Sequence, residues 1–186
     1  MKKMILAVGL LGLTGSLAIA TPSYADEVVC RGTLRTAQVT NLRVPSGAAC
    51  TLNGTRVRGN IRVQSRATLT ATGVRVNGNI QAENATRVTV RSQSVVGGNI
   101  QIEESQAATI TDTRINGDLQ FEENTSLLQA ARNTIGGNLQ GFKNRGGLRV
   151  NSNRIGGNLQ CKENRPAPTG RGNVVRGNKE DQCARL

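Results

Sequence analysis

The residues of this chain with the clearest chemistry are four cysteines, arranged as two widely separated pairs. Cys30 and Cys50 lie 20 residues apart, and Cys161 and Cys183 lie 22 residues apart. No CxxC pair occurs, and the two pairs stand near opposite ends of the chain, which disfavours a zinc site or a reactive dithiol. The thiols are therefore candidates for disulfides.

Regularly spaced arginines are the second pattern that could do chemistry. Between residues 31 and 82 the chain has eight arginines and no acidic residue. Four arginines share one repeated position, three residues before a recurring glycine: Arg56, Arg75, Arg114 and Arg154. A basic stripe attracts anionic partners such as phosphorylated glycans, lipopolysaccharide or acidic polysaccharide. The alternative is a solvated surface without a partner, because single-sign patches also serve solubility.

Two further sets of side chains share repeated positions. The glutamates are Glu83, Glu103 and Glu122. Such a column could bind a cation such as calcium, although stacked glutamates more often splay into solvent. The threonines are Thr51, Thr70, Thr89 and Thr109. A regular threonine array would suit an ice-binding face, but Arg87 and Arg91 flank Thr89 and interrupt it.

The side chains that the sequence lacks exclude several functions. Histidine and tryptophan are absent, and the aromatic residues are one Tyr and two Phe. Histidine-based acid–base catalysis, Ser-His-Asp triads and histidine metal sites are impossible, and platforms for stacking sugars or bases are scarce. We expect no enzymatic activity, no cofactor, no metal site and no nucleic-acid partner.

The first 25 residues predict a secretory signal peptide. Lys2 and Lys3 precede an apolar stretch at 4–20, and a small-x-small pattern ends at Ala25, the expected cleavage point. Cleavage after Ala20 and a retained membrane anchor are the alternatives. Without the leader, 22 basic and 12 acidic residues remain, a net charge of +10. We expect a secreted, periplasmic or cell-surface protein with no transmembrane segment after cleavage.

A glycine-marked repeat fills most of the mature chain, residues 26–186. Seven glycines, each followed by Asn or once by Asp, recur every 19 or 20 residues: Gly59, Gly78, Gly98, Gly117, Gly137, Gly157 and Gly177. A degenerate copy at 40–43 lies one period earlier, so the repeats run from about 40 to 176. Because a chain this poor in large side chains cannot build a thick core, we expect its repeats to stack on one another.

Apolar residues alternate with polar ones inside each repeat. Ile61 and Val63 are two residues apart, as are Val88 and Val90, and this period of two predicts strands. Three such segments per repeat predict three faces, since 19–20 residues at roughly 3.3 Å each enclose a triangle with sides of about five residues. We therefore predict an all-β, three-sided parallel solenoid of about seven coils.

The residues around the recurring glycine predict structural ladders and a turn. Those that follow the glycine could form an asparagine ladder: Asn60, Asn79, Asn99, Asp118, Asn138, Asn158 and Asn178. The next outward column, from Arg62 through five glutamines to Glu180, predicts a glutamine ladder. The residue before the glycine is mostly Asn or Gly, such as Asn77 and Gly97, which predicts a left-handed turn there.

These repeats resemble those of right-handed parallel β-helix proteins, over almost the whole mature chain. The resemblance implies a single-stranded right-handed β-helix and carries no activity. The left-handed hexapeptide acyltransferases differ in coil and motif length, and they depend on a catalytic histidine that this chain lacks. The stretch from Gly157 to Cys183 is also similar to the endings of uncharacterised secreted bacterial proteins, which implies secretion and a cysteine-bearing cap.

Coil stacking selects one of the three pairings that four cysteines allow. Residues one coil apart lie about 5 Å apart, within reach of a disulfide, so we predict Cys30–Cys50 and Cys161–Cys183. Proline cannot donate a hydrogen bond to an added strand, and Pro45, Pro166 and Pro168 lie near the two ends. We expect a monomer.

Three kinds of function remain open. The first is an exported, non-enzymatic envelope or surface protein that binds an anionic polysaccharide or another envelope polymer through its arginines. The second is a matrix protein whose repeat is itself the function. The third is a polysaccharide lyase or hydrolase, which would need inserted loops and paired acids that these coils lack.

Overall fold

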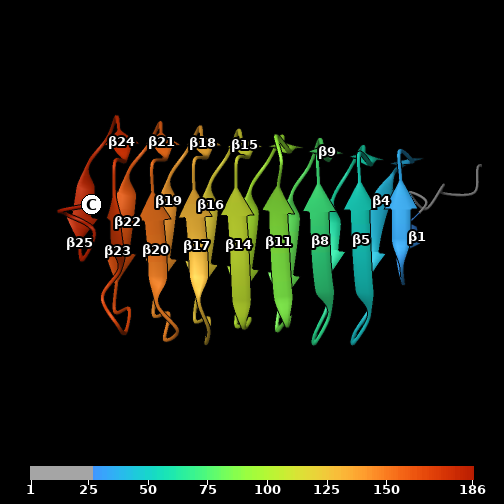
Figure 1. Cartoon of the computed structure of the whole chain (residues 1–186), viewed down its shortest axis with the longest axis horizontal. Coiled ribbons are helices and arrows are strands. Elements are labelled where there is room, and N and C mark those ends of the chain that lie inside the picture. The colour runs from blue at the N-terminus through green and yellow to red at the C-terminus, as the bar shows by residue number, and fades with distance from the viewer. Residues whose placement is uncertain (1–26) are drawn as a thin grey trace, which may run out of the picture.

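The chain folds as a parallel β-solenoid in which three sheets run along a single axis (Figure 1). The computed structural model describes residues 27–186, and the predicted signal peptide lies outside them. Each coil contributes one strand to each sheet, and every strand pairs in parallel with the equivalent strand of the next coil. No helix occurs within the described range, so the predicted all-β solenoid is confirmed.

We name the sheets A, B and C in the order in which the chain enters them. Sheet A contains β1 (Glu27–Val29), β4 (Asn41–Val44), β7 (Ile61–Val63), β10 (Ile80–Glu83), β13 (Ile100–Glu103), β16 (Leu119–Glu122), β19 (Leu139–Phe142), β22 (Leu159–Lys162) and β25 (Lys179–Asp181). Sheet B contains β2 (Thr33–Arg35), β5 (Ala49–Asn53), β8 (Thr68–Thr72), β11 (Arg87–Arg91), β14 (Ala107–Thr111), β17 (Leu128–Ala131), β20 (Leu148–Asn151) and β23 (Thr169–Arg171). Sheet C contains β3 (Gln38–Val39), β6 (Arg56–Val57), β9 (Arg75–Val76), β12 (Val95–Val96), β15 (Arg114–Ile115), β18 (Thr134–Ile135), β21 (Arg154–Ile155) and β24 (Val174–Val175).

The interior is a narrow column of stacked aliphatic side chains. Ile80, Ile100 and Leu119 occupy one register position on sheet A, and none of them has exposed surface. Phe121 is the largest fully buried side chain. Burying a side chain of this kind contributes about 1.5–3 kcal/mol, and each coil obtains that burial only from the coils above and below it.

The prediction of a left-handed turn before the recurring glycine is wrong. Neither Asn77 nor Gly97 has a positive φ; left-handed residues instead follow the strands of sheets A and B, as at Glu104 (φ 48°) and Asp112 (φ 50°). Glycine is required at position 97 by close approach, because an added Cβ would lie 2.2 Å from the carbonyl oxygen of Asn77. The corner between sheets C and A is therefore tight without being left-handed.

The column of residues after the recurring glycine connects the coils through backbone donors. Asn99 N–H donates to Oδ1 of Asn79 at 2.7 Å, and Asp118 N–H donates to Oδ1 of Asn99 at 2.9 Å. We expected the side-chain amides to bond to one another. Instead, each side-chain oxygen accepts a hydrogen bond from a backbone N–H of the next coil. A carboxylate serves equally well, and Oδ1 of Asp118 accepts from Asn138 N–H at 2.6 Å.

The neighbouring glutamine column does form a side-chain ladder. Nε2 of Gln101 donates to Oε1 of Gln120 at 2.9 Å, and Nε2 of Gln120 donates to Oε1 of Gln140 at 2.8 Å. The series begins at Gln81 and ends where Gln160 donates to Glu180 at 2.7 Å. Arg62 precedes Gln81 in register, but within residues 27–186 the first bond of the ladder is the one from Gln81 to Gln101.

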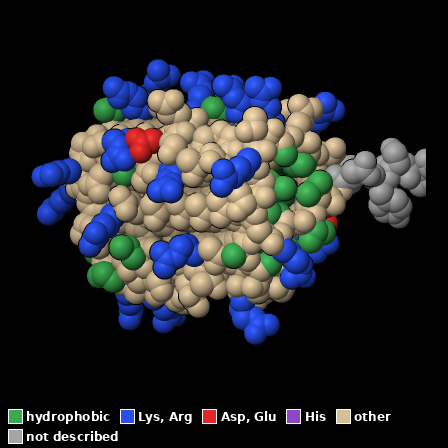
Figure 2. Space-filling view, turned by 45° about the vertical axis from the view of Figure 1, so that its right-hand side comes forward, with side chains coloured by type: hydrophobic (Ala, Val, Ile, Leu, Met, Phe, Trp, Pro, Cys, Tyr) green, Lys and Arg blue, Asp and Glu red, His purple; other side chains and the backbone are tan. Residues whose placement is uncertain are grey.

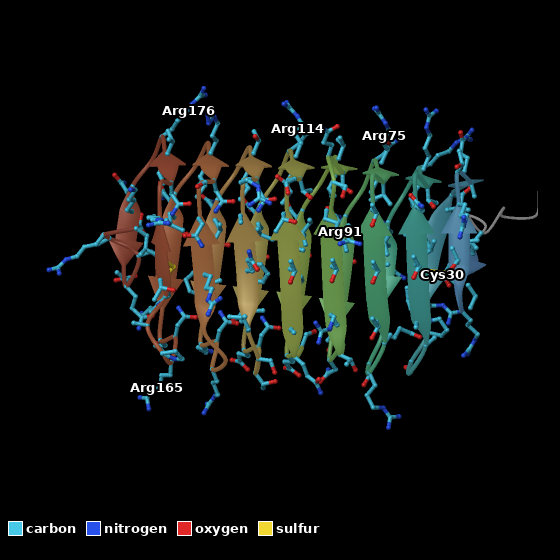
Figure 3. The ribbon with its side chains drawn as sticks, viewed as in Figure 1. Cys30, Arg75, Arg91, Arg114, Arg165 and Arg176 are labelled. Carbon is cyan, nitrogen blue, oxygen red and sulfur yellow. A yellow bond between two sulfur atoms is a disulfide. The ribbon has the colours of Figure 1, made fainter. Side chains whose placement is uncertain are left out.

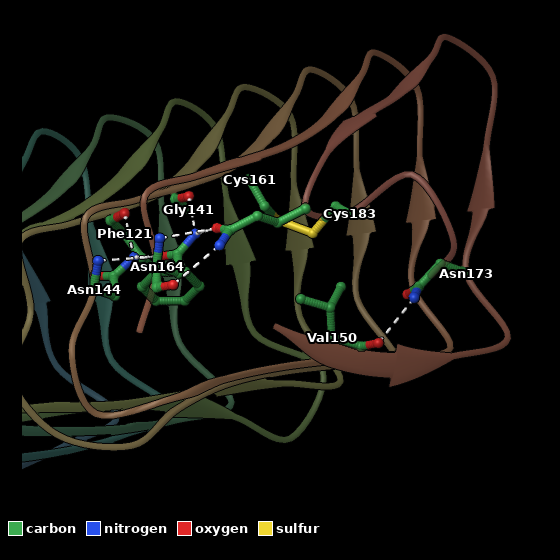
Figure 4. Close-up of a disulfide and its surroundings, with 9 residues drawn as sticks. Phe121, Gly141, Asn144, Val150, Cys161, Asn164, Asn173 and Cys183 are labelled. Carbon is green, nitrogen blue, oxygen red and sulfur yellow. Dashed lines mark hydrogen bonds between the residues drawn. A yellow bond between two sulfur atoms is a disulfide. The ribbon is translucent and has the colours of Figure 1, made fainter. Parts of the chain in front are cut away.

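Two further asparagine columns lie inside the solenoid, and their 20-residue spacing is the sequence signal for them. They consist of Asn124, Asn144 and Asn164 at one corner and Asn133, Asn153 and Asn173 at another. Nδ2 of Asn144 donates to the carbonyl oxygen of Phe121 at 3.0 Å and to Oδ1 of Asn164 at 2.9 Å (Figure 4). These bonds satisfy polar groups that would be costly to bury alone.

Both predicted disulfides are confirmed. The Cα atoms of Cys30 and Cys50 are 5.6 Å apart, and those of Cys161 and Cys183 are 5.2 Å apart. All four sulfur-bearing side chains are buried. Cys183 lies in the turn after β25, so the second bond ties this last turn onto β22 (Figure 4).

Candidate anion-binding surface

The four arginines of the predicted stripe occupy one register column on sheet C. Each is the first residue of a two-residue strand, in which the arginine points outward and the next residue inward. Val57 and Ile115, the partners of Arg56 and Arg114, are 1% exposed. Burial of the aliphatic residue therefore fixes the outward direction of each guanidinium, because successive side chains of a strand face opposite ways.

The arginines of the column are unevenly spaced along the axis. Arg56 and Arg75 are direct register partners. Val95 separates Arg75 from Arg114, and Thr134 separates Arg114 from Arg154. Figure 3 shows Arg75 and Arg114 projecting from the same edge of the solenoid, together with Arg176.

The structure adds Arg58 and Arg176 to this edge, which the sequence pattern did not single out as binding residues. Both lie two residues beyond the main column position, one near each end of sheet C, and both are exposed. Arg58 joins Arg56, Arg75 and Gln38 around a shallow hollow of about 340 Å³. Three guanidinium groups therefore surround one depression, an arrangement suited to anions because a guanidinium fork fits carboxylate or phosphate.

The acidic strand residues are confined to one of the three faces. In the described part of the chain, every acidic strand residue belongs to sheet A: Glu27, Glu83, Glu103, Glu122, Glu180 and Asp181. The charged strand residues of sheets B and C are all arginines: Arg35, Arg87, Arg91, Arg149, Arg171, Arg56, Arg75, Arg114 and Arg154. Figure 2 shows basic side chains spread over one face and its upper edge, with acidic side chains visible in few places.

The sheet C arginines also keep their charge uncompensated. Within residues 27–186, the ion pairs are Arg43–Glu27, Arg132–Asp112 and Lys143–Glu123, and none involves the column. Among the described residues, the only side-chain hydrogen bond that the column arginines make is from Nε of Arg114 to Oδ1 of Asn116, at 3.3 Å. These guanidinium groups are thus available to an external anion.

The glutamate column stands in register on sheet A. Glu103 lies between Glu83 and Glu122, and its pKa is raised by burial and by repulsion from those two carboxylates and Glu104. Arg62 lines the same hollow as Glu83 and Glu103. Among the residues that the structure describes, no three His, Cys, Asp or Glu side chains are grouped to hold a metal ion.

The threonine column is in register on sheet B. Thr70 pairs with Thr51 and Thr89, and Thr89 pairs with Thr109. Arg87 and Arg91 begin and end β11 on either side of Thr89 (Figure 3 labels Arg91). Gln129 follows Thr109 in the next coil, so the threonine array is short as well as interrupted.

No family model matches the chain, and no curated protein or solved structure matches it either. Across residues 27–186 no helix has the length and apolar character needed to cross a membrane.

Proposed function

We propose that this protein is exported and binds an anionic polymer of the cell envelope or surroundings, without catalysis, through its arginine-bearing faces. The observation that carries the proposal is the charge segregation, because sheets B and C present arginine and no acidic strand residue in the described chain. A surface of one sign raises the local concentration of polymers of the opposite sign. The stacked strands of sheet C place the attachment points of its arginines in one register column along the axis.

Export is supported by two independent features. Residues 1–25 have the pattern of a secretory leader. Four buried cysteines form two disulfides, and such bonds persist in oxidising compartments. Candidate partners are acidic polysaccharides, phosphorylated glycans and lipopolysaccharide.

The test is binding of the purified oxidised protein to immobilised acidic polysaccharide over a series of salt concentrations. The variant replaces the column arginines with glutamine: R56Q, R75Q, R114Q and R154Q. Its matched control removes the same charge elsewhere, at exposed basic residues of the last coil and terminus: K162Q, R165Q, K179Q and R185Q. We expect salt-sensitive binding that the column variant weakens much more than the control does.

Binding that is insensitive to salt, or equal losses in the two variants, would refute the proposed surface. The same samples should be assayed for release of unsaturated uronate and of reducing ends. Either product would favour the polysaccharide-cleaving alternative.

A further inference from the structure

We infer that the sheet C edge is matched to a linear polysaccharide that carries one anionic group on every second sugar. This inference rests on the proposed function and specifies the polymer. It is drawn from the alternation of charged and neutral residues in the column and from the short side chains beside it.

Beyond the adjacent pair Arg56 and Arg75, the charges of the column recur every second coil. From β9 to β21 the register positions are Arg75, Val95, Arg114, Thr134 and Arg154. Since neighbouring strands lie about 4.8 Å apart, the attachment points of consecutive arginines are roughly 9.6 Å apart along the axis. That length is close to one disaccharide of an extended polysaccharide, and one neutral position lies between each pair of charges.

A strip of short side chains runs beside the arginines. Two residues after each column position the chain has Asn or Gly, namely Asn77, Gly97, Asn116, Gly136 and Gly156. Glycine is enforced at position 136, where an added Cβ would lie 2.2 Å from the carbonyl oxygen of Asn116. Arg58 and Arg176 stand at the two ends of this strip, so basic side chains flank the short ones at both ends.

The spacing of the arginines distinguishes this polysaccharide from other polyanions. A polyuronate with a carboxylate on every sugar would place half of its charges against Val95 and Thr134, which cannot pair with them. A nucleic-acid duplex carries one charge per about 1.7 Å of axis, a spacing unrelated to this column. A polymer with a single acid per disaccharide pairs each charge with one guanidinium and leaves its neutral sugar at the intervening position.

The test compares hyaluronate, with one carboxylate per disaccharide, and polygalacturonate, with one on every sugar, at equal chain length and carboxylate concentration. Nonspecific attraction would favour polygalacturonate because its charge density is higher. We expect the protein instead to bind hyaluronate more tightly, by about threefold or more. The variant V95R/T134R fills the neutral positions and should reverse this preference.

Position 134 is exposed and position 95 is half-buried, and both face outward. The variant V95R/T134R should therefore remain folded, and its melting temperature will verify this. The control Q106R/T125R adds equal charge at exposed turns between sheets A and B and should leave the preference unchanged. Salt-sensitive binding to both polymers without a preference for hyaluronate would overturn the inference and leave the proposed function standing. Absence of salt-sensitive binding to either polymer would overturn both.

Discussion

The side-chain oxygen of Asn79 occupies the space in which a side chain on Gly98 would begin. A Cβ added to Gly98 would lie 2.1 Å from Oδ1 of Asn79, and this same oxygen accepts the N–H of Asn99 at 2.7 Å. The two residues of the recurring Gly-Asn pair therefore depend on each other. The asparagine of one coil accepts a hydrogen bond from the next coil, and the glycine of that next coil leaves room for the asparagine side chain.

This relationship predicts strong coupling between the two positions. Gly98→Ala should destabilise the fold by about 2 kcal/mol through overpacking, and Asn79→Ala by about 1 kcal/mol through loss of a hydrogen bond. In the double variant the methyl group introduced at position 98 no longer meets an amide oxygen from position 79. The destabilisation of the double variant should therefore be clearly smaller than the sum of the two single destabilisations. Urea unfolding of all four proteins measures the coupling, and additive costs would contradict the proposed steric conflict.

The two buried asparagine columns should contribute more to stability than the outer column of residues that follow the recurring glycine. Oδ1 of Asn144 accepts from N–H and Nδ2 of Asn124, and Nδ2 of Asn144 donates to Phe121 and Asn164. Asn144→Ala leaves several of these buried groups unpaired and should cost about 3 kcal/mol, because each unsatisfied group costs about 1–3 kcal/mol.

The control for this prediction is Asn158→Ala, which removes the single hydrogen bond that Oδ1 of Asn158 accepts, from Asn178 N–H. That bond is exposed, so its loss should cost at most about 1 kcal/mol. Equal shifts of the urea midpoint for the two variants would show that burial of the column carries no special weight.

Each disulfide should stabilise its own end of the solenoid. The bonds close loops with sequence separations of 20 and 22, for which loss of denatured-state entropy corresponds to about 3 kcal/mol each. Replacing either pair with alanine should lower the melting temperature, and adding a reductant should then affect only the remaining bond. A double-alanine variant that melts with the parent would contradict this account.

Stability should depend on pH through Glu103. Its pKa is raised by burial and by neighbouring carboxylates, so the folded state favours the protonated form more than the unfolded state does. The corresponding stabilisation is present below the ordinary carboxyl pKa and is lost as pH rises through the raised value. Glu103→Gln should therefore be more stable than the parent at neutral pH, with the difference shrinking in acid.

Asp112 provides a control of opposite sign. The hydrogen bond from Arg132 lowers the pKa of Asp112, so its stabilisation is present at neutral pH and is lost as pH falls through the lowered value. Asp112→Asn should be less stable than the parent at neutral pH and should converge with it in acid. Parallel stability–pH curves for Glu103→Gln and the parent would refute the role assigned to Glu103.

The sequence alone determined the coil and what depends directly on its length. The spacing of the recurring glycines sets a coil of 19 or 20 residues, and alternation within it assigns inward and outward positions, since strand side chains alternate. Residues one period apart must then be neighbours, which is why the cysteine pairs and the register of Arg56 with Arg75 could be predicted.

Only the tertiary structure decided how the corners are built and how charge is shared among the faces. A corner depends on contacts between coils, so Gly97 is selected by the carbonyl oxygen of Asn77 and not by its own φ, and local sequence rules misplaced the turn. The confinement of the acidic strand residues to sheet A emerges once each segment is assigned to a sheet. A periodic sequence fixes which residues stack, whereas the path of the backbone around each coil fixes which columns share a face.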